Sequence, residues 1–200
     1  MPVVSPRKLA VADIADMRAY ERERPAFLAR IIELKRRRRV GVGPFVTLLF
    51  ESRDTVRFQV QEMARVEKLI TDEAIQTELD IYNPLIPEAG ELSATLFVEL
   101  TTDQLLREWL PKLVGIERAV VLRLAGGSEV RCVVEKQHES QLTRDDITST
   151  VHYVRWELSA AQVDEFVSGP VTVAVDHPSY QHEHVLDADT VAELTGDLTA

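Results

Sequence analysis

The sequence predicts an α+β protein, in which N-terminal helices pack on a largely antiparallel sheet of about six strands. Helix formers with apolar positions three and four apart dominate residues 5–79. Alternating and β-branched runs dominate from Leu92 onward, with Gly and Pro between the runs. We treat residues 1–200 as one α+β domain, with a subdivision into a helix-rich part, 1–90, and a strand-rich part, 91–200, as the alternative.

Residues 5–39 are expected to form two helices. Pro25 separates them, because proline lacks the backbone N–H and disfavours a helical residue before it. Asp13 has the side chain of an N-cap for the first helix. The second helix ends in the basic run 35–39, where cations suit the negative end of the helix dipole. Residues 40–44, Val-Gly-Val-Gly-Pro, are expected to turn the chain into a strand.

A buried strand over Val46–Phe50 leads into an amphipathic segment over 53–70. The first half of that segment alternates like a strand, but its second half is rich in helix formers and lacks Gly and Pro. We therefore predict a helix, with Ser52 or Asp54 as its N-cap. A further helix is expected from a cap at Thr71 to about Leu79.

The second half of the chain has the β-branched content and alternation of strands. The candidates are Leu92–Leu100, Ala119–Leu124, Val130–Glu135, Val151–Leu158 and Val171–Val175. Gly126–Ser128 separates two of them at the length of a hairpin turn. Two helices with capping boxes that start at Thr101 and Ser159 interrupt the strands, and a short helix is expected over Asp187–Leu198.

Composition indicates a soluble cytoplasmic protein. The 200 residues are 45% apolar and 28% charged, which is ordinary for a globular chain. No apolar run approaches the roughly 18 residues that a membrane span needs, and the N-terminus lacks a signal-peptide pattern. A single cysteine, Cys132, excludes an internal disulfide and fits a reducing compartment.

Charge is distributed unevenly along the chain. Residues 1–70 contain 15 Lys and Arg against 9 Asp and Glu, whereas residues 71–200 contain 8 against 24. The basic part either lies against the acidic part of the same fold, or meets a second copy or another charged partner. The arginine run 36–39 has the chemistry to bind phosphate, but no aromatic residues interleave with it. Together with the net charge of −10, this argues against nucleic-acid binding.

A set of motifs along almost the whole chain resembles the uncharacterised bacterial domain-of-unknown-function family numbered 3501. The motifs are Met17–Pro25, Lys35–Arg39, Gly43–Pro44, Thr47–Glu51, Gln59–Glu67, Tyr82–Pro87, Thr148–His152 and Asp176–Tyr180. The resemblance implies no activity, because the family has none established. Genes of that family often neighbour rubrerythrin-like and iron–sulfur oxidoreductase genes, so the resemblance implies a redox or iron-containing protein partner.

The amphipathic helix predicted over 53–70 supplies the first candidate site. Glu62 and Arg65 are three residues apart and share a helix face, and Arg53 lies at the start of the same helix. One interpretation is an internal brace that specifies how the helices meet the sheet. The other is an anionic-ligand site or an enzyme site in which these residues meet His152 or His177.

The histidines near the C-terminus supply a second candidate. His177, His182 and His184 have the ligand type for zinc or iron, and in an extended segment the last two point to one side. The alternative is a polar turn after the last strand. Because Cys pairs and an HExxH helix are absent from the sequence, we predict no cofactor, with Zn or Fe as the alternative.

The missing catalytic motifs and the charge asymmetry favour a non-enzymatic accessory or interaction protein. The family resemblance implies a rubrerythrin-like or iron–sulfur redox system as its setting. The alternative is a small anionic-ligand-binding protein or enzyme with a Glu/Arg/His site, with or without a metal. The sequence leaves the choice between enzyme and non-enzyme open.

Overall fold

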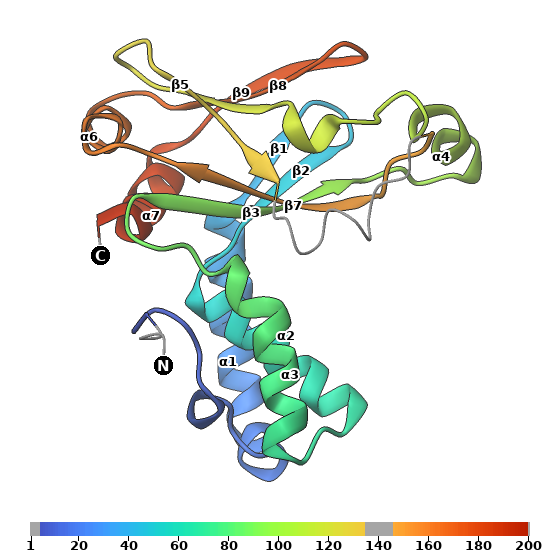
Figure 1. Ribbon diagram of the computed structural model, residues 1–200, viewed down its shortest axis with the longest axis vertical. Helices are drawn as coiled ribbons and strands as arrows, with labels where there is room; N and C mark the ends of the chain where they lie inside the picture. Colours follow the sequence, from blue (N-terminus) through green and yellow to red (C-terminus); the bar gives the residue numbers. More distant parts are fainter. Residues whose placement is uncertain (1–4, 135–145, 200) are drawn as a thin grey trace.

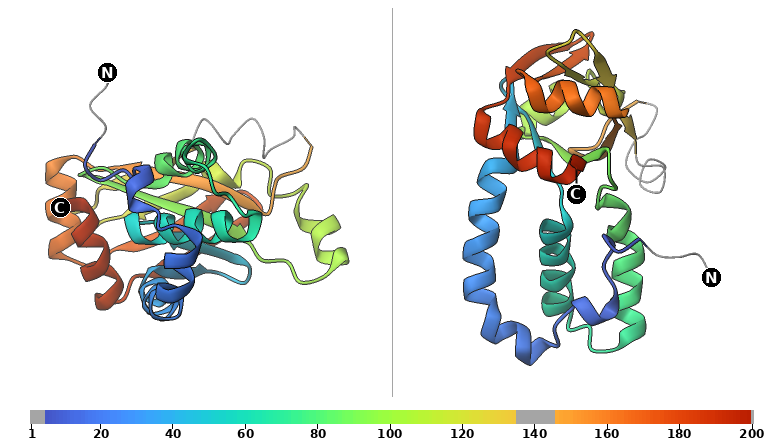
Figure 2. Two further views of the ribbon diagram at one scale, coloured as in Figure 1. Left: turned by 90° about the horizontal axis from the view of Figure 1, so that it is seen from below. Right: turned by 90° about the vertical axis from the view of Figure 1, so that its left-hand side faces the viewer.

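Two stacked antiparallel sheets form the body of the protein, and three helices form an arm that projects from one of them (Figure 1). The computed structural model describes residues 5–134 and 146–199. Figure 2 shows the three arm helices running side by side away from the body. The chain enters the body from the arm at residue 39, returns to the arm at residue 53 and leaves it at residue 85.

The described strands divide between two sheets, each antiparallel throughout. The first sheet has the order β1-β2-β3-β7-β6 and the second β5-β4-β8-β9. The strands are β1 (Arg39–Val42), β2 (Val46–Phe50), β3 (Glu91–Val98), β4 (Val120–Arg123), β5 (Glu129–Arg131), β6 (Val133–Val134), β7 (Val151–Glu157), β8 (Thr172–His177) and β9 (Tyr180–Val185).

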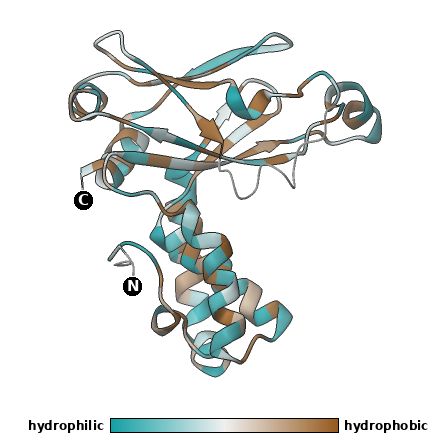
Figure 3. Ribbon diagram, viewed as in Figure 1, coloured by the Kyte–Doolittle hydropathy of each residue, from teal (hydrophilic) through white to brown (hydrophobic). Residues whose placement is uncertain are grey.

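Alternate residues of both sheets form one hydrophobic core between them. Leu48 and Leu96 from the first sheet and Leu122 and Val173 from the second are fully buried in it. This follows from the period of two in a strand, which directs every second side chain toward the facing sheet. Figure 3 shows hydrophobic positions on the strands of both sheets, whereas hydrophilic and hydrophobic positions alternate around the arm.

The arm consists of α1 (Met17–Arg38), α2 (Arg53–Glu67) and α3 (Asp72–Tyr82). Short 3₁₀ turns lie at Val11–Asp13 before α1 and at Asn83–Leu85 after α3. Helix α2 contacts both of its neighbours. Its Val56, Val60 and Ala64 pack with Ile75 and Leu79 of α3 in a cluster separate from the core between the sheets.

Polar side chains fix where the arm helices begin. The side chains of Asp16, Ser52 and Thr71 accept hydrogen bonds from backbone N–H groups three residues ahead, as N-caps do. Helix α2 ends at Lys68, which has a left-handed conformation with φ 57°. This C-cap turns the chain sharply toward α3.

Three further helices lie against the body: α4 (Asp103–Trp109), α6 (Ala160–Ser168) and α7 (Ala188–Thr199). The capping box at Ser159 forms as predicted, and Asp187 accepts from Thr190 N at 2.8 Å or less to start α7. Figure 1 places α6 and α7 at one end of the sheets and α4 at the other.

The α+β class and the antiparallel strands predicted from the sequence are confirmed. The described strands, however, number nine in two sheets rather than about six in one. The N-terminal helices form a projecting arm rather than a flat layer, and α4, α6 and α7 come later in the chain. Strands from both sides of residue 90 form the first sheet, because β1 pairs with β2 and β2 pairs with β3.

Four local predictions differ from the structure. Residues 17–38 form one helix with Pro25 inside it, where the exposed ring costs one hydrogen bond while both halves stay packed on α2. Its cap is Asp16 rather than Asp13. Residues 40–42 belong to β1 rather than to a turn. Helix α4 is capped by Thr102 rather than Thr101. Besides these four, the strand predicted over Val130–Glu135 is split at Cys132 into β5 of the second sheet and β6 of the first, and Glu135 lies outside the described residues.

The described residues include no helix with both the length and the apolar character needed to cross a membrane.

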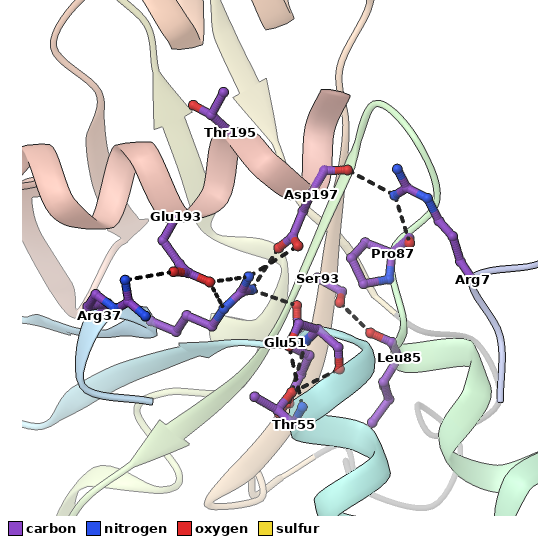
Figure 4. A network of polar contacts seen from close by, with 12 residues as sticks. Arg7, Arg37, Glu51, Thr55, Leu85, Pro87, Ser93, Glu193, Thr195 and Asp197 are labelled. Atoms are coloured by element: carbon purple, nitrogen blue, oxygen red, sulfur yellow. Dashed lines mark hydrogen bonds and ion pairs between the residues drawn. The ribbon is translucent and has the colours of Figure 1, made fainter. Parts of the chain in front are cut away.

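Arg38, the last residue of α1, joins the arm to the body. Its side chain is 3% exposed and donates to Glu193 at 2.9 and 3.1 Å and to Asp197 at 2.7 and 3.1 Å. It also donates to the backbone oxygen of Glu51 at 3.2 Å. Figure 4 shows Glu51, Glu193 and Asp197 around this point. One guanidinium thus ties α1 to α7 and to the end of β2.

We expect Arg38→Met to lower the free energy of unfolding by about 3 kcal/mol, because it removes the buried cation shared by two carboxylates that are only 16% exposed. Arg37→Met is the matched control. Arg37 is the neighbouring residue and contacts the same Glu193 at 3.3 Å, but its side chain is 43% exposed. Its loss should cost less than about 1 kcal/mol. Urea unfolding of both variants measures the difference, and equal small losses would refute the assigned role of Arg38.

Candidate functional site on the helical arm

The structure does not bring the predicted site residues together. Arg53, Glu62 and Arg65 lie on α2 in the arm. His152 lies on β7 of the first sheet, with its side chain buried, and His177 lies at the end of β8 in the second sheet. The expectation of a combined Glu/Arg/His site is therefore wrong, because its members belong to three separate parts of the fold.

Glu62 is the centre of a polar cluster between α1 and α2. Its Oε1 accepts from Tyr20 Oη at 2.6 Å and from Arg24 Nε at 2.8 Å, and its Oε2 accepts from Arg24 Nη2 at 2.9 Å. The Arg24 guanidinium lowers the pKa of Glu62 to about 2, with Tyr20 and Arg65 adding to the effect and burial opposing it. Burial and the hydrogen bond to Glu62 raise the pKa of Tyr20. The cluster therefore braces α1 against α2 within the arm, rather than fixing how the helices meet the sheet as the first interpretation expects.

Arg53 holds the start of the described chain against α2. Its Nη2 lies 2.7 Å from Asp13 Oδ1. One turn further along α2, Arg57 donates to the backbone oxygen of Asp13 at 2.8 Å and to Glu23 at 3.1 Å. Arg53 is therefore engaged within the arm and does not face a ligand cavity with the histidines.

His152 is a structural residue of the sandwich. Its Nε2 lies 3.0 Å from the Ser149 carbonyl oxygen and 2.9 Å from Thr148 Oγ1. Because a carbonyl accepts only, Nε2 carries a proton. Burial lowers the pKa of His152, which keeps the ring neutral near pH 7.

The three C-terminal histidines do not assemble as a metal site. His177 Nε2 donates to Val114 O at 3.0 Å, and its Nδ1 accepts from Ser179 N at 3.2 Å, so neither ring nitrogen offers a lone pair. His182 and His184 lie exposed on β9, so the segment is an extended strand and the alternative of a polar turn is wrong. Across residues 5–134 and 146–199, no group of three or more His, Cys, Asp or Glu is placed to hold a metal ion.

Cys132 lies between β5 and β6, where the chain passes from one sheet to the other. It is buried, and its Sγ donates to Glu117 O at 3.2 Å. Burial raises the pKa of this thiol to about 11, so it remains protonated at neutral pH. Cys132 therefore behaves as a small apolar residue of the core.

The free end of the arm contains a cavity of about 380 Å³, which we call the tip pocket. Its walls come from the turn before α1, the end of α2 and the start of α3. The lining residues are Val11, Ile14, Ala15, Asp16, Met17, Arg18, Gln61, Ala64, Arg65, Leu69, Ile70, Thr71, Asp72 and Ile75. The volume lies in the range of small-molecule and side-chain binding pockets.

Two local features shape the tip pocket. The buried amide of Gln61 donates to Ala15 O at 2.9 Å and accepts from Ala15 N at 3.0 Å, which fixes the segment before α1 against α2. The left-handed Lys68 carries Leu69 and Ile70 out of the helix. As a result Ile70 is 83% exposed at the rim, with Met17 also exposed.

Arg65 gives the tip pocket a positively charged group. Its Nη atoms lie 3.5 Å from Glu62 and 3.7 Å from Glu21, which are long contacts for ion pairs. Its buried Nε forms no hydrogen bond with any described residue. Arg65 therefore retains donor capacity on the side of α2 that lines the pocket.

The sequence matches the family described as "Protein of unknown function (DUF3501)" over residues 8–198. The chain belongs to this family. A crystal structure of a protein of unknown function from Burkholderia pseudomallei is similar to it, with 37% sequence identity and a TM-score of 0.87. The similarity covers 96% of this chain and 99% of that chain. No curated protein matches the sequence.

The tip pocket of this DUF3501 protein is the feature that sequence reasoning missed. Its signal was present in Leu69-Ile70, two aliphatic residues between the end of one predicted helix and the cap of the next. Turns at such positions are usually polar, so exposed aliphatic residues there indicate a contact surface. The Arg65–Glu62 spacing alone could not reveal that Arg24, 38 residues away from Glu62, donates hydrogen bonds to the carboxylate of Glu62.

We expect Glu62→Gln to lower the free energy of unfolding by about 2 kcal/mol at neutral pH, allowing for partial solvent exposure. The folded-state pKa of Glu62 is depressed below its ordinary 4.5 to about 2. Its contribution is therefore complete above pH 4.5 and is lost as pH falls toward 2. The stability difference between wild type and variant should shrink over this acidic range.

Urea unfolding at a series of pH values from neutral to about 3 measures this difference. Glu33→Gln is the control, because Glu33 also pairs with an arginine on α1, at 2.6 Å from Arg36, but in an exposed position. The Glu33 variant should differ little from wild type at any pH. A pH-independent deficit for Glu62→Gln would show that the hydrogen-bond geometry, and not the charge, stabilises the arm.

Proposed function

We propose that this DUF3501 protein is a non-enzymatic interaction protein that docks a partner protein at the tip of its helical arm. The observation that carries the proposal is the tip pocket, an apolar cavity of about 380 Å³ with a largely exposed isoleucine at its rim. Exposed aliphatic residues around a concave apolar site are typical of interaction surfaces.

The chemistry of the tip pocket defines what the partner presents. Leu69, Ile70 and Ile75 favour an aliphatic or aromatic side chain that fills the cavity. Arg65, whose Nη atoms form only long contacts with Glu62 and Glu21, favours a carboxylate beside that side chain. The partner contact is thus an apolar residue next to Asp or Glu.

The arm supports this proposal by its geometry. It extends the tip pocket away from the two sheets, so that a partner can approach without contacting the body (Figure 2). The Glu62 cluster and the Gln61–Ala15 hydrogen bonds hold the three helices in a fixed arrangement. Docking on such a preformed surface costs little conformational entropy.

We assign the partner to redox or iron-containing proteins, of the rubrerythrin-like or iron–sulfur oxidoreductase type. The support is the genomic association that family membership brings. We place the interaction in the cytoplasm, the compartment that the composition and the single buried cysteine favour.

We expect Ile70→Asp to weaken partner binding about ten-fold or more, because it removes a buried aliphatic side chain from the interface and places a charge in an apolar pocket. The matched control is Ile32→Asp. Ile32 is also on the arm and 61% exposed, but it does not line the tip pocket. Neither side chain supports the fold, so both variants should unfold like wild type.

Calorimetry with a purified rubrerythrin-like protein and a purified iron–sulfur oxidoreductase from the same organism measures the binding. The proposal fails if neither protein binds wild type, or if Ile32→Asp weakens binding as much as Ile70→Asp. Sedimentation of the protein alone at the same concentrations distinguishes partner binding from self-association, the other expectation from the charge asymmetry.

A further inference from the structure

A second cavity lies at the other end of the arm, where α1 and α2 meet the outer face of the first sheet. Its volume is about 190 Å³, below the usual range for drug-sized ligands, so it suits only a compact molecule. We call it the root pocket. Leu49 and Phe97 supply apolar walls, Tyr82 and Tyr153 supply aromatic rings with hydroxyl groups, and Glu51 and Lys35 supply opposite charges.

Glu51 is a built-in acceptor in the root pocket. The residue is 9% exposed. Its Oε1 accepts from Thr95 Oγ1 at 2.6 Å and its Oε2 from Thr55 Oγ1 at 2.5 Å, and Figure 4 shows Glu51 beside Thr55. A carboxylate offers about four acceptor positions, so two remain beyond these hydroxyl groups. The two threonines therefore hold the carboxylate in a fixed orientation without neutralising its charge.

Lys35 brings a positive charge to the same cavity. It projects from α1, and its Nζ lies 5.4 Å from the centre of the Phe58 ring. None of the described residues forms an ion pair with Lys35 or with the carboxylate of Glu51 at 4.0 Å or less. Two opposite charges thus line one cavity, each uncompensated by the described part of the protein. Leaving such groups unpaired is unfavourable unless a ligand or solvent engages both.

We propose that the root pocket binds a small zwitterion of the α-amino-acid class. The ammonium group of the ligand donates to Glu51, its carboxylate accepts from Lys35, and its side chain lies between Tyr82, Tyr153 and Phe97. A zwitterion satisfies both charges with one compact molecule, whereas an anion leaves Glu51 opposed by a like charge.

The tyrosines fit this assignment. Burial raises the pKa of Tyr153, with Tyr82 and Glu51 adding to the shift, so its hydroxyl stays neutral at physiological pH. A neutral aromatic wall accommodates apolar and aromatic side chains and accepts an ammonium group above its ring face. This site is independent of the proposed docking at the tip pocket, and neither requires the other.

Isothermal titration calorimetry of the full chain with the free proteinogenic L-amino acids, each at millimolar concentration, tests the proposal. At least one should bind. Its N-acetyl derivative, which lacks the ammonium group, and its amide, which lacks the carboxylate, should each bind about ten-fold more weakly or worse, because each loses one charge-assisted contact.

Variants assign those losses to residues. Glu51→Gln should weaken binding of the free amino acid by about ten-fold or more but leave binding of the N-acetyl derivative unchanged. Lys35→Met should weaken binding of the free amino acid to a similar extent but leave binding of the amide unchanged. Glu108→Gln and Lys112→Met are controls, because Glu108 on α4 forms an exposed ion pair with Lys112, which follows that helix. Both controls should bind like wild type.

The proposal is overturned if no free amino acid binds, if the N-acetyl derivative binds as well as the parent, or if both root-pocket variants bind like wild type. Thermal unfolding establishes whether each variant is folded. Should Glu51→Gln fail to fold, the comparison of parent, N-acetyl and amide ligands on the wild-type protein still decides the question.

Discussion

The arrangement of the whole molecule depends on the buried guanidinium of Arg38. It stands where a long helix ends and the first strand begins, and it binds two carboxylates of the C-terminal helix together with the end of β2. Without this cation the carboxylates of Glu193 and Asp197, which both lie on α7, would repel each other at the junction. The same contact also orients Glu51, whose backbone oxygen accepts from Arg38 while its side chain enters the root pocket. The contacts of Arg38 therefore both attach the arm to the body and fix the geometry of the root pocket.

Helix α2 connects the two candidate sites within the arm. Near its start, Thr55 orients Glu51 in the root pocket, and at its end Ala64 and Arg65 line the tip pocket. The helix packs on both sides, so neither wall can move without the other helices. The arm is therefore a rigid spacer, and the chemistry at its two ends is different. The root combines the buried carboxylate of Glu51 with the ammonium group of Lys35, whereas the tip is mainly apolar and is also lined by two arginines and two aspartates.

The sequence predicted the parts of the fold that depend on local signals. Ser52, Thr71 and Ser159 began helices as expected, and Gly126–Ser128 formed the expected hairpin. Features set by distant contacts were missed. Pro25 does not break α1, because packing of the opposite helix face outweighs one lost hydrogen bond. Residues 40–42 became a strand because β2 pairs with them. The combined Glu/Arg/His site was mispredicted for the same reason, since nothing local in the sequence shows that both ring nitrogens of His177 form hydrogen bonds with the backbone.

The two faces of α2 differ in their contacts, and this difference shows where the cations of the charge asymmetry lie in the structure. Toward α1 the ion pairs Arg24–Glu62 and Arg57–Glu23 cross the interface beside an aromatic contact of Phe58 with α1. Toward α3 they are apolar, through Val60 and its neighbours. The excess of cations in the first seventy residues is therefore largely used inside the arm and at its junction with α7, rather than displayed as one basic surface. This distribution explains how a chain with an arginine-rich first third can offer an apolar pocket as its most distinctive exposed feature.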